Sequence, residues 1–186
     1  MDTFTALTTR VSIPRLTDPG PSARHIEQLL QVALRAPDHG LLRPWRFIVL
    51  EGEQRQRLGD IMERRLLREQ PGADEMTRRK ARDKALRAPT IIIAVAEINE
   101  HHKTPVWEQV VAVGAAVQNM MLAAHALGVG AMWRTGALAC DDQVKQELGF
   151  ASKDQIVAFL YLGTQAGTQK PLPEQNVDSY LRELPQ

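Results

Sequence analysis

Three side chains near the start of the sequence could together bind an anionic group. Arg10, Ser12 and Arg15 lie close together in the segment TRVSIPRL. A guanidinium gives a phosphate charged, bidentate hydrogen-bond donors, a hydroxyl adds a neutral donor, and nearby backbone N–H groups can complete the site. Arginine and serine are common neighbours, so this segment indicates a phosphate site only together with further evidence.

A second concentration of polar and aromatic side chains occurs in RAPDHGLLRPWRF, residues 35–47. It follows an apolar pattern at helical spacing over residues 24–36, which Ser22 could cap. Pro37 is expected to end that helix, and Pro44 to direct the chain into a strand that begins at Trp45. Arg43 and Arg46 are interpreted as surface residues, and Trp45 as a core aromatic.

Other chemistry-bearing segments fit known patterns poorly. GVG at 128–130 lies between a helix and a strand, whereas the dinucleotide-binding fingerprint needs a strand, a turn and then a helix. EINEHHK offers four candidate metal ligands, but adjacent histidines point to different sides and the spacing matches no zinc pattern, which favours a solvated turn. The four residues are Glu97, Glu100, His101 and His102.

Nucleophilic and acid–base chemistry is also weakly supported. Asp38 and His39 are neighbours in the sequence, and such neighbours seldom present both groups to one substrate. A triad with Ser12 would lack the GxSxG elbow that frames a nucleophilic serine. Cys140 follows the apolar segment GALA, which favours an ordinary buried thiol over a nucleophile.

The elements that must position these residues can be predicted from apolar patterning. We expect helices over 24–36, 53–69, 74–87, 104–127 and near 141–148, and strands over 45–52, 88–97, 130–138 and 155–163. Thr104 and Pro105 are expected at the N-cap and first position of the long helix, and Gly128 at its end. The continuously apolar strand APTIIIAVAE indicates a sheet that is covered on both faces.

Composition limits the possible functions. The 186 residues are expected to form a single domain over 1–186, and the net charge of +1 does not suggest a nucleic-acid or membrane-surface protein. Residues 64–87 contain nine basic and four acidic side chains, for which a solvated helical surface is the favoured interpretation. Polar residues interrupt the apolar stretch 105–127, so it is predicted to be a buried helix and not a membrane span.

The N-terminal residues and the cysteine content favour the cytoplasm. MDTFTALTTR has neither a basic n-region nor a long apolar h-region, so a secretory signal is not expected. Cys140 is the single cysteine and cannot form an internal disulfide, which suits a reducing compartment.

The element order predicts a three-layer α/β or α+β domain. The helix over 104–127 carries apolar residues around its whole axis, and one chain of this length has few elements with which to cover it. We therefore expect a second copy of the chain to pack against this helix.

The motifs and their order resemble the FMN-dependent nitroreductase family, above all its short bacterial members. The resemblance covers nearly the entire chain. It rests on Arg10-x-Ser12-x-x-Arg15-Leu16, RAPDHGLLRPWRF at 35–47, WEQVVAVGAAVQNMMLAAHALGVGAMWRTGAL at 107–138 and FLYLGT at 159–164. It implies a central, mostly antiparallel sheet flanked by helices, in a homodimer that binds FMN at the subunit interface. It also implies NAD(P)H as reductant and a ping-pong reduction of nitro compounds, quinones or related small-molecule acceptors.

The resemblance also assigns cofactor-binding positions, residue by residue. They are Arg10, Val11 and Ser12 on the N-terminal segment, Arg35 and His39 at a helix end, and Trp133, Arg134 and Thr135 on a strand. It implies that the 10–12 segment and the Arg35/His39 segment reach one flavin from different subunits. No catalytic side chain and no metal are expected, because hydride passes directly between nicotinamide C4 and flavin N5.

Two features of the assigned site leave alternatives open. Short family members often have two arginines before the serine, and Val11 replaces the second, so FMN affinity is weaker or another basic residue such as Lys170 compensates. A cation near the flavin N1 and O2 edge would stabilise the reduced ring. Arg134, Arg35 and Arg15 are all candidates for that role.

Two other functions remain to be distinguished from a reductase. The first is a flavin protein that catalyses another reaction, such as an oxidation or a reductive dehalogenation. The second is a nucleic-acid-binding module that uses the arginines of residues 64–87, for which a steep salt dependence of affinity would be diagnostic.

Overall fold

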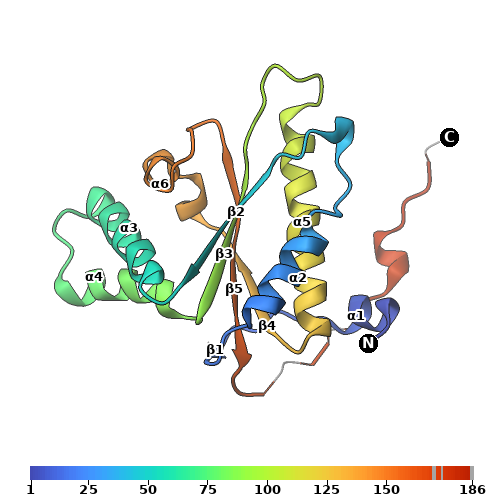
Figure 1. Cartoon of the computed structure of the whole chain (residues 1–186), viewed down its shortest axis with the longest axis horizontal. Coiled ribbons are helices and arrows are strands. Elements are labelled where there is room, and N and C mark those ends of the chain that lie inside the picture. Colours follow the sequence, from blue (N-terminus) through green and yellow to red (C-terminus); the bar gives the residue numbers. More distant parts are fainter. Residues whose placement is uncertain (169–170, 173, 185–186) are drawn as a thin grey trace.

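A computed structural model describes residues 1–168, 171–172 and 174–184. Its centre is an antiparallel sheet in which β2 (Trp45–Glu51), β3 (Thr90–Ala96), β5 (Gln155–Gln165) and β4 (Gly130–Arg134) are neighbours in that order. The short β1 (Leu16–Thr17) pairs with the far end of β5. Helices cover both faces of the sheet, so the expected three-layer arrangement is confirmed (Figure 1).

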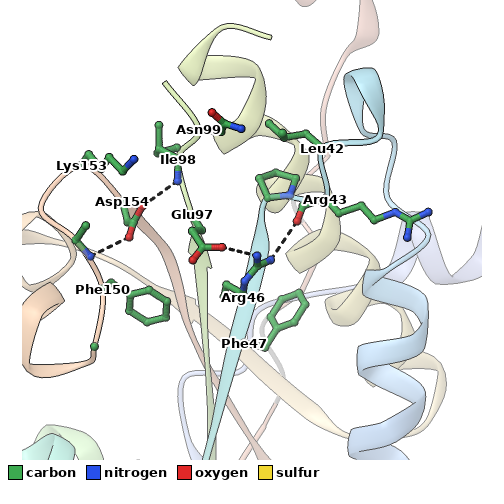
Figure 2. A pocket seen from close by; sticks show the side chains of 13 residues that line it. Leu42, Arg43, Arg46, Phe47, Glu97, Ile98, Asn99, Phe150, Lys153 and Asp154 are labelled. Atoms are coloured by element: carbon green, nitrogen blue, oxygen red, sulfur yellow. Dashed lines mark hydrogen bonds and ion pairs between the residues drawn. The ribbon is translucent and has the colours of Figure 1, made fainter. Parts of the chain in front are cut away.

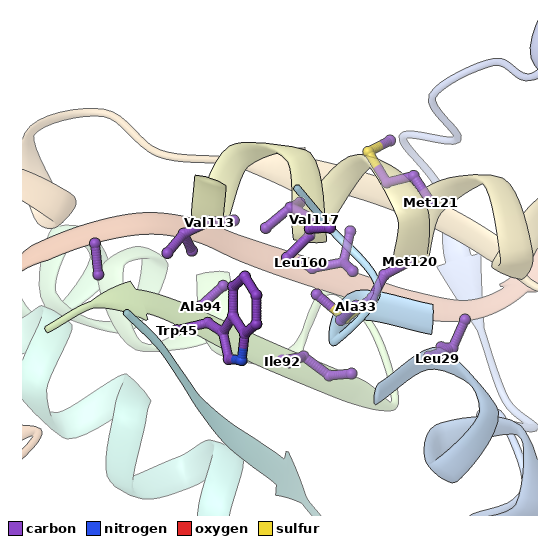
Figure 3. Close-up of a cluster of buried hydrophobic side chains, with 14 of the residues drawn as sticks. Leu29, Ala33, Trp45, Ile92, Ala94, Val113, Val117, Met120, Met121 and Leu160 are labelled. Atoms are coloured by element: carbon purple, nitrogen blue, oxygen red, sulfur yellow. The ribbon is translucent and has the colours of Figure 1, made fainter. Parts of the chain in front are cut away.

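The two faces of β3 contribute to two separate cores. Ile92, Ala94 and Ala96 pack toward α2 (Ala23–Ala33) and α5 (Val106–Ala126), whereas Ile91, Ile93 and Val95 face α3 (Gln54–Glu69). Successive side chains of a strand point to opposite faces, so a continuously apolar run fits only a strand that is covered twice. Figure 3 shows the first core, where Trp45, Ile92, Ala94 and Leu160 of the sheet meet Val113, Val117 and Met120 of α5.

The long helix α5 differs from the prediction at its start and agrees with it at its end. Thr104 and Pro105 were expected as N-cap and first helical residue, but the helix begins at Val106 and Pro105 is its cap without a side-chain hydrogen bond. The Thr104 hydroxyl instead donates to the backbone carbonyl of His39 at 3.3 Å, which takes it away from the helix end. Gly128 adopts a φ of +73° beyond the last turn, so the predicted stop is confirmed.

The remaining predicted elements are present with different limits. The helix predicted over 24–36 ends at Ala33, several residues before Pro37, which was expected to end it. Arg35 therefore lies in a turn beyond the helix. The helix over 74–87 divides into α4 (Glu75–Arg82) and a 3-10 helix (Asp83–Leu86). The strand over 130–138 ends at Arg134, and a 3-10 helix, Ala137–Cys140, precedes α6 (Asp142–Glu147).

Four elements of the described residues have no counterpart among the predicted ones. They are α1 (Thr3–Thr9), β1, and the 3-10 helices at His39–Leu41 and Val177–Tyr180. Asp2 caps α1 by accepting the backbone N–H of Thr5 at 3.0 Å, a local signal that the sequence does carry. Within the described ranges, no helix combines the length and apolarity that a membrane crossing requires.

The arginines of residues 64–87 are largely engaged in ion pairs within the chain. Arg78 and Arg82 both contact Glu63, at 2.6 and 2.7 Å, and Arg68 contacts Asp141 at 2.8 Å. Hydrogen bonds from Arg82 and Arg78 hold the pKa of Glu63 below its ordinary value of 4.5. The charge run therefore ties α3 to α4 and α6, in agreement with its interpretation as a helical surface.

Candidate functional site

The segment that contains Arg10 lies against the beginning of the edge strand β4. The backbone N–H of Ile13 donates to the carbonyl of Ala131 at 2.9 Å, which fixes the segment to that strand. Arg10 is half-buried, and within the described residues its Nη1 atom is buried without a hydrogen-bond partner. An unpaired buried cationic donor is costly, so the geometry favours an anionic ligand at this position.

Ser12 and Arg15 line a cavity next to the one that Arg10 lines. Both are exposed, and with Ala166 and Gly167 they line a cavity of about 310 Å³. Val11 packs its side chain against the core on the α3 side of the sheet, so only its backbone is available to a ligand. Lys170, the proposed compensating base, lies outside the described residues.

The other end of β4 carries the second predicted set of residues. The Trp133 side chain packs against the α5 core, and its indole N–H donates to the carbonyl of Val157 at 2.9 Å. Arg134 points to the opposite face, where its guanidinium lies 5.6 Å from the centre of the Tyr161 ring. Trp133 can therefore meet a ligand only through its backbone, whereas Thr135 is exposed just beyond the strand.

The edge of β4 joins these two sets into one surface. β4 pairs with β5 along one side, and within the described ranges its other side receives one backbone hydrogen bond, from Ile13 at its beginning. Four residues separate Gly130 from Arg134, which corresponds to about 13 Å along a strand. Two buried nitrogen atoms, Arg10 Nη1 and Arg134 Nε, have no hydrogen-bond partner among the described residues. They lie near opposite ends of this edge.

His39 lies near the opposite end of α5 from Arg10. His39 hydrogen-bonds Glu108 in the first turn of α5 through Nδ1, with 2.5 Å between His39 Nδ1 and Glu108 Oε2. Arg10, by contrast, shares a small cavity with His125 in the last turn of α5. Glu108 and His125 are 17 positions apart in the helix, or about 25 Å. Arg35 follows α2, whose Val32 carbonyl accepts from Asn119 in the second half of α5 at 3.1 Å. One chain therefore does not bring His39 to Arg10, and Figure 1 shows α1, which precedes Arg10, beside the C-terminal end of α5.

His125 is a residue that the sequence reasoning did not single out. Its Nε2 atom lies 2.9 Å from the hydroxyl of Thr9, the last residue of α1 and the neighbour of Arg10. This contact attaches the end of α1 to the end of α5 and so positions the Arg10 segment. A histidine in the last turn of an apolar helix gives no such signal in sequence, because its partner is 116 residues away.

The rejected alternatives can now be compared with the geometry. Asp38 accepts the backbone N–H of Arg43 at 2.6 Å and Ser12 lies at the other end of α5 from His39, so neither the pair nor the triad is assembled. His102 accepts the N–H of Thr104 at 3.1 Å within a turn. Among the described residues, no group of three histidine, cysteine or carboxylate side chains could hold a metal ion.

The expectation of a buried Cys140 thiol is wrong, because this residue is exposed. The 3-10 helix Ala137–Cys140 turns Ala139 toward the core. The next residue in such a helix therefore points outward.

A large cavity lies at a different end of the sheet, and charged side chains in its lining already have partners within the chain. It measures about 770 Å³ and contains none of the predicted site residues. Asp154 is buried and accepts the backbone N–H groups of Ile98 and Ala151 at 2.8 and 2.9 Å, while Arg46 pairs with Glu97 (Figure 2). Its charged groups stabilise the loops before β2 and β5, so it gives little support for a ligand site.

The aromatic side chain beside Arg134 has a perturbed acidity. Burial raises the pKa of the Tyr161 phenol above its ordinary value of 10, and the positive charges of Arg134 and Arg87 partly oppose this rise. The phenol therefore stays protonated near neutral pH and can act as a hydrogen-bond donor.

Comparison with known proteins identifies the family. The model of the Nitroreductase family matches residues 7–164. The chain belongs to the nitroreductase family. The "Putative NAD(P)H nitroreductase YdjA" of Escherichia coli K12 is 41% identical over 177 residues, which cover 94% of this chain and 96% of that protein. The expected oxidoreductase class is thus confirmed for this nitroreductase-family chain.

Solved structures confirm the fold. A nitroreductase-like family protein from Bacillus cereus superposes with a TM-score of 0.84 over 99% of this chain and 96% of that one, at 22% identity. A nitroreductase with bound FMN from Bacteroides fragilis NCTC 9343 gives a TM-score of 0.71 over 95% and 96% of the chains, at 19% identity. At these identities the likeness concerns the architecture of the antiparallel sheet and its flanking helices.

Proposed function

We propose that this nitroreductase-family protein binds FMN along the edge of β4 and uses it to carry two electrons from NADH or NADPH to a nitro compound, quinone or related acceptor. The observation that carries the proposal is the buried Nη1 of Arg10, which has no partner among the described residues. Arg10 and Ser12 line neighbouring cavities that share Ile13 and Gln165, and the FMN phosphate would lie between the two side chains. The Trp133 backbone and the residues Arg134 and Thr135, about 13 Å further along the strand, would contact the flavin ring. The bound FMN of the Bacteroides fragilis relative supports this choice of cofactor.

We further propose that two copies of the chain complete each site. His39 lies about 25 Å of helix away from Arg10, so it can reach the same flavin only from a second chain whose α5 runs in the opposite direction. We assign Arg35 to that flavin together with His39. Apolar side chains that remain exposed on one chain support such a partner. They include Phe4 and Leu7 of α1, Trp107 and Val111 of α5, and Tyr180 and Leu181 near the C-terminus.

The side chains of this protein would bind and orient, and none need transfer a proton to the flavin. FMN, when bound, supplies the two-electron carrier that accepts hydride from the nicotinamide and passes electrons to the acceptor. Arg10 and Ser12 would hold the phosphate, and the free backbone edge of β4 would orient the ring system. In this arrangement Arg134, which lies over the Tyr161 ring, would stand at the flavin ring end, where a guanidinium would stabilise negative charge on the reduced ring.

The absorption spectrum of the purified protein tests the cofactor. A yellow chromophore that is released as FMN on denaturation is the expected result, because the described part of the chain contains no dinucleotide-binding strand, turn and helix for the adenosine half of FAD. Recovery of FAD alone would contradict the proposal. Anaerobic addition of NADH or NADPH should then bleach the bound flavin, whereas no reduction by either would favour a flavin protein of another reaction type.

Subunit exchange tests the shared site. Arg10→Ala and His39→Ala homodimers should each be inactive, and heterodimers formed from them should regain one intact site. Light scattering on the same samples checks the assembly. A monomer that binds FMN would refute the dimer, and heterodimers without recovered activity would refute the sharing of sites.

A further inference from the structure

A second cavity adjoins the proposed flavin site on the α3 side of the sheet. It measures about 660 Å³, within the range of small-molecule sites. Its floor is apolar, and its lining continues along β4 to Arg134 and Thr135. The apolar residues are Met62 and Leu66 of α3, Ala81 of α4, Met132 of β4 and Phe159 of β5. Such a floor suits a flat, unsaturated molecule.

The rim of this cavity is strongly cationic. Lys84, Arg87 and Arg134 line it, and none of the three forms an ion pair with a carboxylate among the described residues. The carboxylate of Glu69 is the one acidic group in the described lining, and Arg65 neutralises it through two hydrogen bonds. The cavity therefore holds uncompensated positive charge next to apolar surface.

The cavity contains buried polar groups that can donate to a ligand. Arg134 Nε is buried and has no hydrogen-bond partner within the described residues. Tyr161 is 3% exposed and lines the same cavity, where its hydroxyl can donate to a ligand. A buried donor is usually satisfied, so the unpaired Arg134 Nε indicates a ligand that brings an acceptor oxygen.

We propose that this cavity binds the carboxylate of a flat, unsaturated electron acceptor, with the ring on the apolar floor and the carboxylate between Arg87 and the Tyr161 hydroxyl. The assignment of this ligand as the acceptor rests on the proposed reductase function. The binding site itself rests on the charge of the cavity and on the unpaired Arg134 Nε. The protein would accordingly select nitro or quinone compounds that carry a carboxylate over neutral ones of the same shape.

Benzoate and benzamide provide matched probes, because neither can be reduced and they differ mainly in charge. Calorimetric titration of the FMN-loaded protein should show benzoate binding about tenfold or more tighter than benzamide, as expected for charge-assisted hydrogen bonds. Arg87→Gln should remove most of this difference, and Tyr161→Phe should reduce it. Arg57→Gln changes an exposed arginine of α3 outside the cavity lining and should leave it unchanged.

Turnover links the site to the reaction. The KM for 4-nitrobenzoate should be well below that for 4-nitrobenzamide, and Arg87→Gln should raise only the former while the KM for NADH or NADPH stays constant. Equal affinities for benzoate and benzamide would overturn the proposal. Benzoate binding that is lost when FMN is bound would also overturn it. A third contrary result would be an Arg87→Gln protein in which only the KM for NADH or NADPH changes. Failure of the reductase function would appear separately, as absent flavin or absent turnover of both nitro compounds with the benzoate preference intact.

Discussion

The substitution Arg10→Ala tests the phosphate site most directly. The Arg10 side chain makes no hydrogen bond or ion pair with any described residue, and its Nη1 is buried. If the FMN phosphate is its partner, the substitution removes one charge-assisted interaction worth about 1.5–3 kcal/mol. This range corresponds to a rise of roughly 10- to 150-fold in the Kd for FMN.

The same geometry predicts that the fold survives. Because the Arg10 side chain contributes no hydrogen bond to a described residue, the free energy of unfolding of the flavin-free protein should change by less than about 0.5 kcal/mol. Titration of flavin-free protein with FMN, followed by quenching of flavin fluorescence, gives the Kd, and urea unfolding gives the stability. Arg24→Ala, at an exposed position in the first turn of α2, is the matched control and should alter neither quantity.

An unchanged Kd for FMN in the folded Arg10→Ala protein would refute the reasoning. The Arg10 guanidinium would then not bind the FMN phosphate. A loss of FMN binding in the Arg24→Ala control would equally show that the effect is one of general positive charge.

Three further substitutions test the packing and electrostatics around the site. Gly130→Ala should destabilise the fold by about 1–3 kcal/mol in urea unfolding, because a Cβ there would lie 2.6 Å from Leu16 Cδ2; an unchanged stability would contradict the tight packing of β4. Gln109→Leu should cost about 2–3 kcal/mol by the same assay, since the buried amide makes three hydrogen bonds that hold the turn before α5. Glu63, whose pKa is lowered in the folded state, should stabilise the protein above its ordinary value of 4.5 and lose this contribution as the pH falls further. Glu63→Gln should therefore flatten the decline in melting temperature below that pH, and a parallel decline in both proteins would exclude this role.

The elements of the sheet could be predicted well because their signals are local. Val, Ile and Ala in TIIIAVA can form only a strand with two covered faces, and the structure gives it one core on each side. Ser22 caps α2 as predicted, by accepting the backbone N–H of His25 at 3.2 Å. The limits of the helices were less predictable. Thr104, for example, does not cap α5, because its hydroxyl donates to the backbone carbonyl of His39.

The candidate site could be predicted only in part. Arg10 and Ser12 stand out by type and spacing, but no local pattern shows that His39 lies at the other end of α5 from Arg10. Nor does sequence show that the Trp133 side chain turns into the core while Arg134 turns outward. These features depend on pairing between segments more than twenty residues apart, where single-sequence patterns carry no information.

The attachment of α5 at both ends has a consequence for how sequences of this kind can vary. Near its start Glu108 contacts His39, and near its end His125 contacts Thr9. Insertion of one residue between them would rotate one end relative to the other by about 100° and lengthen the helix by about 1.5 Å, so both contacts could not persist. Insertions and deletions should therefore accumulate in the connecting loops, while the number of residues in α5 stays constant.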